Sequence, residues 1–190
     1  MDALNILYHF YPEDTPLRQL LLKHSTQVRD KALAIRRAAG RKGENADPGL
    51  VAAGALLHDI GIGHCHAPKI LCTGTEDYMR HGIIGARLLR GYGAEMGENY
   101  EPYARICERH TGSGLTAAEI RAENLPLPEE DFLPETPEET LICLADKFFS
   151  KSGDLQEKSL KKVRKSMEKF GEAPARRLED LLRYWEIADD

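Results

Sequence analysis

The sequence lacks the features of exported and membrane-spanning chains. Its start, MDALNILYHFYPED, has neither a basic region nor an uninterrupted apolar run, so no secretory signal is visible. The longest uncharged apolar stretch, 48–57, is far shorter than the roughly 20 residues needed to cross a bilayer. We therefore expect a cytoplasmic protein with no membrane partner.

Cysteine is scarce and scattered. The four cysteines form no CxxC pair, which argues against a disulfide framework and against a ribbon-type zinc site. A reducing compartment is the default for such a chain. His64, Cys65, His66 and Cys72 could in principle form a small structural zinc site, but the adjacent spacing HCH is poor for tetrahedral coordination.

The chain also lacks an excess of positive charge. Its net charge of −5 argues against bulk electrostatic binding to nucleic acid or to an anionic membrane, although a small phosphorylated ligand is compatible with it. One C-terminal helix carries a basic face made of Lys158, Lys161, Lys162, Arg164, Lys165 and Lys169. We interpret this face as a solvated helix surface, with RNA contact as the alternative, and expect no nucleic-acid partner.

Convincing strand patterns are absent, and helix signals are frequent. Helices are predicted for 16–39, 48–59, 80–91, 100–110, 117–122, 137–151, 155–170 and 173–187, from capping residues, helix-ending glycines and apolar periodicity. Residues 5–11 are the one stretch that could be extended. The acidic, proline-rich stretch 123–139 is predicted to be a solvated loop, either a plain connector or a lid. The sequence thus predicts an all-α fold.

Length and composition predict one domain. A chain of 190 residues with 42% hydrophobic content can bury a proper core. We expect residues 1–190 to form a single domain with a core at about 17–152. The C-terminal helices, within 155–187, are expected to pack on that core.

Five polar side chains are predicted to face inward. Four histidines share a helical face with apolar residues, and an aspartate interrupts the apolar segment LICLADKFF; these five are His24, His58, His81, His110 and Asp146. One histidine on an apolar stripe is typical of a hydrogen-bonded core residue. Five inward groups, with Asp59 beside His58, are costly, because each unpaired buried polar group costs several kcal/mol. One shared cation would satisfy all of them.

These residues carry a family resemblance. His24, the doublet His58-Asp59 and Asp146 resemble the H…HD…D signature of the HD superfamily of metal-dependent phosphohydrolases, over about 17–152. His81 and His110 look like the additional histidines of the two-metal branch. That branch includes dinucleoside tetraphosphate hydrolases and cyclic dinucleotide phosphodiesterases. The resemblance implies an all-α HD-domain helical bundle with the metal site at its centre.

The resemblance also implies a ligand set. By it, one divalent metal ion is held by His24, His58, Asp59 and Asp146, and a second is held by Asp59, His81 and His110. Asp59 bridges the two ions and is the residue expected to be essential for catalysis. Two ions, iron, manganese or similar, would generate a hydroxide nucleophile and would clamp the phosphoryl oxygens.

Several residues are candidates for substrate contact. HTGSG places a flexible turn directly after a proposed ligand, and backbone N–H groups in such a turn can point at a phosphate; alternatively its glycines only end a helix. Arg109 is expected to point away from the site. The substrate-binding candidates are Thr111, Gly112, Ser113, Gly114, Lys147, His64 and His66, of which the last two have a surface role as their alternative.

The leading functional hypothesis is a phosphohydrolase that acts on a nucleotide or another small phosphate ester by attack of a metal-bound hydroxide. One departure bears on the substrate: Ile62 stands where many cyclic dinucleotide phosphodiesterases carry a lysine, and their GYP motif is missing. A mixed-valence di-iron oxygenase of HD type is one alternative. A non-catalytic regulatory HD module is another, which the complete ligand set argues against.

Overall fold

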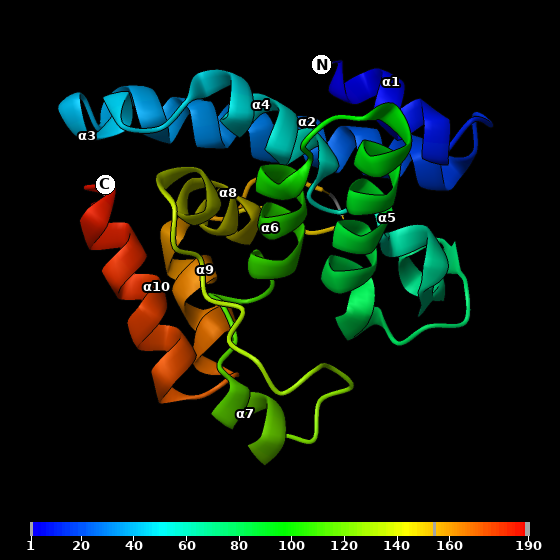
Figure 1. The fold of residues 1–190 in the computed structure, drawn as a ribbon. Helices are drawn as coiled ribbons and strands as arrows, with labels where there is room; N and C mark the ends of the chain where they lie inside the picture. Colours follow the sequence, from blue (N-terminus) through cyan, green and yellow to red (C-terminus); the bar gives the residue numbers. More distant parts are fainter. Residues whose placement is uncertain (1, 154, 189–190) are drawn as a thin grey trace.

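The computed structural model is helical, as predicted (Figure 1). It describes residues 2–153 and 155–188. The α-helices in that part of the chain are α1 (Ala3–Phe10), α2 (Pro16–Ala38), α3 (Arg41–Glu44), α4 (Pro48–Leu57), α5 (His81–Met96), α6 (Glu101–Arg109), α7 (Ala117–Ala122), α8 (Pro137–Lys147), α9 (Leu160–Glu168) and α10 (Glu172–Tyr184). No helix among these residues is both long enough and apolar enough to pass through a membrane.

Capping chemistry explains why most helices begin where the sequence predicted. The side chains of Thr15 and Asp47 each accept a hydrogen bond from the backbone N–H three residues later, and a proline follows each of them. Thr116 and Thr136 form capping boxes with the glutamates three residues on. These side chains satisfy backbone donors that the first helical turn leaves without partners.

The N-terminal segment corrects a prediction. Residues 5–11, which could have been extended, lie almost wholly within α1. Asp2 caps this helix by accepting hydrogen bonds from the N–H groups of Leu4 and Asn5. Ala3, Ile6 and Leu7 are buried at helical spacing, so packing of this apolar face outweighs the β propensity of the aromatic residues.

Three further helix limits differ from the predictions. α5 runs through Gly91 and ends before Gly97, whose positive φ of 68° provides the left-handed cap. α8 ends at Lys147 and not at residue 151. α9 begins only after Ser159, which caps it, so the predicted start at residue 155 is wrong.

The segment between α4 and α5 holds short elements that left no periodic signal in the sequence. Three 3-10 turns, η1 (Ile62–His64), η2 (Pro68–Ile70) and η3 (Tyr78–Arg80), alternate with the strands β1 (His66–Ala67) and β2 (Cys72–Thr73). The strands pair antiparallel, with His66 opposite Thr73. Strands of two residues are too short to show alternation, so the sequence did not predict them.

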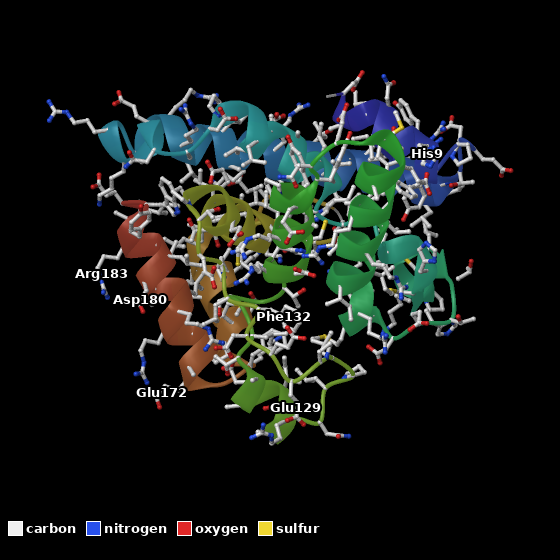
Figure 2. The ribbon with its side chains drawn as sticks, viewed as in Figure 1. His9, Glu129, Phe132, Glu172, Asp180 and Arg183 are labelled. Atoms are coloured by element: carbon white, nitrogen blue, oxygen red, sulfur yellow. The ribbon has the colours of Figure 1, made fainter. Side chains whose placement is uncertain are left out.

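The connector between α7 and α8 has no helix from 124 to 135, as expected of a loop. Its tip is exposed around Glu129, whereas Phe132 is buried and pairs through its backbone with Leu115 (Figure 2). Glu138 and Glu139 are also buried, so the predicted solvation does not hold for the end of this stretch.

Two apolar clusters form the core. One joins α2, α4, α8, α9 and α10, and it includes the fully buried Trp185. The other joins α1, the first half of α2, the end of α4, α5 and α6. Figure 1 shows α2 and α4 side by side, with α5 and α6 crossing beneath them. The helices that build these clusters also carry the buried polar side chains.

Candidate metal centre

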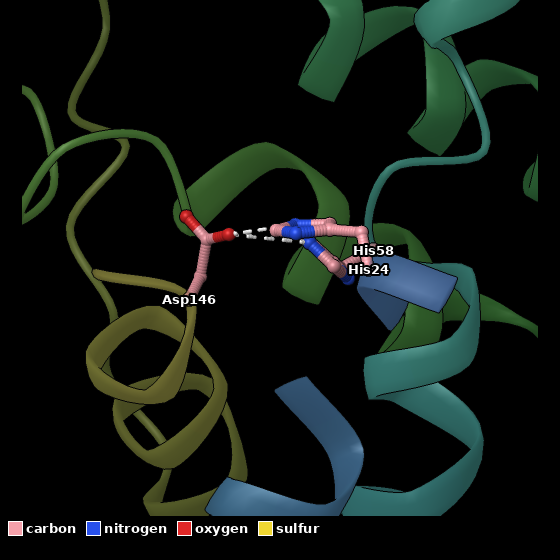
Figure 3. A group of neighbouring side chains, drawn as sticks. All are labelled: His24, His58 and Asp146. Carbon is pink, nitrogen blue, oxygen red and sulfur yellow. Dashed lines mark hydrogen bonds and ion pairs between the residues drawn. The ribbon is translucent and has the colours of Figure 1, made fainter. Parts of the chain in front are cut away.

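The six side chains proposed as ligands converge from five separate parts of the fold. His24 lies on α2, His58 and Asp59 follow α4, His81 begins α5, His110 follows α6, and Asp146 lies near the end of α8. The first five residues are at most 4% exposed. Figure 3 shows how His24, His58 and Asp146 point at one another.

The two oxygens of Asp59 face two different groups of nitrogens. Oδ2 lies 3.2 Å from Nε2 of His24 and 3.2 Å from Nε2 of His58. Oδ1 lies 3.4 Å from Nε2 of both His81 and His110. On the first side, Asp146 Oδ1 completes the group at 3.0 Å from His24 Nε2. Asp59 therefore stands between two clusters of nitrogen and oxygen donors.

Three of the imidazoles are oriented by the backbone in the same way. Nδ1 of His58, His81 and His110 each contacts the carbonyl oxygen three residues earlier in the chain, at 2.7, 2.6 and 2.8 Å. A carbonyl can only accept, so Nδ1 is the protonated nitrogen that donates. Nε2 is then the nitrogen that faces inward, and in its unprotonated form it offers a lone pair, as in metal-binding histidines.

Several inward atoms have no hydrogen bond, which tests whether a cation fits. Among the described residues, His58 Nε2 and both oxygens of Asp59 are buried without a hydrogen-bond partner of acceptable geometry. Nε2 of His81 and Nε2 of His110 lie 3.0 Å apart, with both Nδ1 protons already donated elsewhere. Facing lone pairs repel unless a positive charge lies between them. A divalent cation with nitrogen and oxygen ligands therefore fits this donor set.

The charges of these groups follow from burial and from each other. Burial lowers the pKa of His58, but the Asp59 and Asp146 carboxylates outweigh it and raise that pKa to about 9. Burial, with His110 nearby, lowers the pKa of His81 to about 3, and burial also lowers that of His110. Burial raises the carboxyl pKa values of Asp59 and Asp146, but nearby positive groups outweigh it and hold both pKa values well below their usual range. The strongest positive influence is His58 for Asp59 and Lys147 for Asp146.

Sequence reasoning missed two residues at this centre. Lys151 places Nζ 2.6 Å from Oδ2 of Asp59 as an ion pair, and its side chain is 11% exposed. The ring of Tyr78 stacks on the imidazole of His81, with centroids 4.6 Å apart. Lys151 was not expected at the centre because a continuous helix was predicted over 137–151, whereas α8 ends at Lys147.

The candidates for substrate contact are distributed unevenly. Lys147 lies at the centre, with Nζ 2.8 Å from Asp146 Oδ2 and 3.1 Å from the carbonyl of His110. The turn after His110 has positive φ at Gly112 and Gly114, while the buried Ser113 hydroxyl already donates to the carbonyl of Pro174. Thr111 is half-buried within the same turn. Their contact with substrate stays a prediction.

The remaining candidates lie farther out. His64 and His66 are exposed, while Cys65 and Cys72 are buried, and these four do not form one of the metal-compatible groups found among the described residues. Arg109 donates to the Leu133 carbonyl and pairs with Glu135, so it points away from the centre, as expected.

Comparison with known proteins gives a family match. A family model described as HD domain matches residues 21–150. An uncharacterized protein of Methanocaldococcus jannaschii is 35% identical over 144 residues, which cover 76% of this chain and 71% of the relative. No solved structure matches the chain.

Two other relatives are named tRNA (cytidine(56)-2'-O)-methyltransferase. The protein of Thermoplasma volcanium is 33% identical over 148 residues, which cover 78% of this chain but 36% of the relative. That of Picrophilus torridus is 41% identical over 104 residues, which cover 55% of this chain and 25% of the relative. The match thus leaves most of both methyltransferases outside the shared region.

Proposed function

The chain belongs to the HD domain family, and from that premise we propose that it is a metal-dependent phosphohydrolase acting on a nucleotide or another small phosphate ester. One observation carries the proposal: buried imidazoles and carboxylates from separate helices direct nitrogen and oxygen atoms at common points, and His58 Nε2 and Asp59 Oδ1 among them have no hydrogen-bond partner. Leaving such atoms unsatisfied would cost several kcal/mol, which a bound cation removes.

The proposed ligand assignment follows the two sides of Asp59. The residues on the Oδ2 side, His24, His58 and Asp146, would hold one cation with Asp59, and those on the Oδ1 side, His81 and His110, would hold another with it. Bound divalent cations would lower the pKa of water for attack on phosphorus and would neutralise phosphoryl oxygens. Iron, manganese and similar ions accept this mixture of ligands.

The chain's own groups would prepare that reaction. The carbonyls three residues before His58, His81 and His110 keep the ring protons away from the ions. Lys147 ties Asp146 to the backbone of His110 and so holds two proposed ligands together. The turn 111–114, Lys147 and the histidines of η1 and β1 are proposed to contact the substrate.

The names of two relatives suggest a different activity. The match covers only part of each relative, which favours two activities in different regions of those chains. The shared region amounts to 36% and 25% of those methyltransferases. We propose that methyl transfer belongs to the rest of those chains and that the shared region contributes the metal centre. Incubation of this protein with a methyl donor and tRNA should then give no methylated product.

Replacing Asp59 by alanine tests the proposed centre. The variant should lose bound metal, and phosphate release from a panel of nucleotides and phosphate esters should fall at least about 1000-fold, because removing the shared ligand removes several kcal/mol of transition-state stabilisation. Asp180→Ala is the matched control, since Asp180 lies on the exposed side of α10 and forms its ion pair within the described part of the chain with Arg183 (Figure 2).

The assay should be run without oxygen. Phosphate release by the wild-type protein under anaerobic conditions would exclude the oxygenase alternative. Oxygen-dependent consumption of a polyol or phosphonate, with an iron radical signal and no phosphate release from esters, would instead contradict the proposed function. Full metal content in Asp59→Ala would contradict the assigned ligands.

A further inference from the structure

The proposed ligands differ in exposure to solvent. Their side chains are at most 5% exposed, except that of Asp146, which is 12% exposed. The side chains of Lys147 and Lys151 are 10% and 11% exposed. Among the described side chains that form ion pairs with these carboxylates, the ones that retain some exposure are therefore two ammonium groups, beside one partly exposed carboxylate. Two positive groups beside the most exposed of the proposed ligands favour the approach of an anion.

The two lysines differ in the groups that they contact. Lys147 donates to the carbonyl of His110 and pairs with Asp146, so a neutral partner and a charged partner both fix it. Lys151 is paired with Asp59 Oδ2 at 2.6 Å. That oxygen also lies 3.2 Å from the nitrogens of His24 and His58, where the proposed cation would bind.

An ammonium group and a divalent cation cannot both bind Asp59 Oδ2 without strong repulsion at these distances. When the cation binds, the ammonium of Lys151 must therefore leave this oxygen. The backbone just before it is held by Lys158, which donates through Nζ to the carbonyls of Lys147 and Phe149. The side chain of Lys151 is flexible and 11% exposed, so its ammonium can turn toward solvent, from which an anion would arrive.

From this geometry we propose that Lys151 binds the phosphoryl group of the substrate at the mouth of the centre, a role that rests on the proposed phosphohydrolase function. In the protein without cations, Lys151 neutralises Asp59. In the loaded protein its ammonium donates to a phosphoryl oxygen that faces away from the ions. The ring of Tyr78, whose centroid is 6.0 Å from Lys151 Nζ, supports the side chain from one side.

The test compares Lys151→Met with Lys151→Arg and with Lys161→Met. Lys161 is exposed on α9, so the last variant removes one lysine charge away from the centre. Each protein is loaded with manganese, and its melting temperature and metal content are measured. Binding of inorganic phosphate to the loaded proteins is then measured by calorimetry, which reports on the lysine without requiring turnover.

We expect Lys151→Met to keep the metal content of the wild type and to bind inorganic phosphate at least about 10-fold more weakly, which is about 1.4 kcal/mol. Lys151→Arg should keep most of the affinity, because it keeps the charge, and Lys161→Met should match the wild type. Metal should bind Lys151→Met at least as tightly as the wild type, because a competing cation is gone.

Two results would overturn the role of Lys151. One is an unchanged phosphate affinity in a folded, metal-loaded Lys151→Met protein whose wild-type parent releases phosphate from esters. The other is loss of metal from Lys151→Met, which would make Lys151 a structural support. A loaded wild-type protein that neither binds phosphate nor releases it would contradict the proposed function itself.

Discussion

Replacing Gly82 by alanine tests whether the spacing of two helices sets the distance between two proposed ligands. Gly82 follows His81 on α5, and a Cβ atom there would lie 2.4 Å from the backbone oxygen of Cys107 on α6. His110 follows three residues after Cys107. Ordinary contact begins near 3.4 Å, so α5 and α6 would have to separate by about 1 Å.

The expected cost follows from this overlap. Overpacking of this kind costs about 1–3 kcal/mol, and alanine in a helix returns up to about 1 kcal/mol relative to glycine. The net destabilisation should be about 1–2 kcal/mol, which lowers the melting temperature by about 2–8 °C in a protein of this size. Metal ligands tolerate displacements of only about 0.2 Å, so His81 and His110 should no longer hold an ion together.

Calorimetry and metal analysis after dialysis would measure both effects. The variant should lose the metal ion proposed at His81 and His110. It should keep the ion proposed at His24, His58 and Asp146. Gly91→Ala is the matched control on the same helix, because its Cβ would have no neighbour within 4 Å. That variant should be stabilised by up to about 1 kcal/mol. A Gly82→Ala protein with unchanged melting temperature and full metal content would refute the reasoning.

Two further predictions concern pH and the loop after Asp59. Without added metal, the raised pKa of His58, about 9 against 6.5, adds stability that is fully present below pH 6.5 and lost as pH rises through 9. Melting temperature should therefore fall between pH 6 and 10, and a saturating divalent cation should flatten this dependence; a flat profile without metal would contradict it. Tyr11→Phe removes a hydroxyl that donates to the Ile60 carbonyl and accepts from the Gly63 N–H, so urea unfolding should show a loss of about 1–3 kcal/mol. A loss below about 0.5 kcal/mol would show that these groups find other partners.

The meeting of five of the six polar side chains was predictable because each lies among apolar residues, whereas Asp59 was included through its place beside His58 and through the family resemblance. His24, for example, shares its stripe with Leu21 and Val28, and the structure buries all three. Burying one face of each helix brings these polar groups to the interior together. The helix starts were predictable for a similar reason, since the capping side chains act only on the next few residues.

Lys151 was not predictable from periodicity. In a continuous helix it would lie five residues after Asp146 and so roughly 140° around the axis from it. The chain instead leaves the helix at Lys147, and contacts with Lys158, eleven residues further on, shape the following turn. Such a turn depends on distant packing, which local sequence does not encode. The longer α5 was missed because Gly91 is exposed and tolerated within a helix, whereas the cap is Gly97.

The histidine protons donated to main-chain carbonyls bear on how this centre can change over evolutionary time. In many metal sites an acidic side chain orients the imidazole, and a single base change can remove it. Here the orienting group for His58, His81 and His110 is the peptide unit itself, which every amino acid supplies. Residues 55 and 107 can therefore change without loss of these hydrogen bonds, provided that the local turn is kept, whereas the side chain of Tyr78 also stacks on His81. Substitutions of the coordinating residues should therefore affect the centre strongly, and substitutions of the residues that supply the carbonyls should affect it much less.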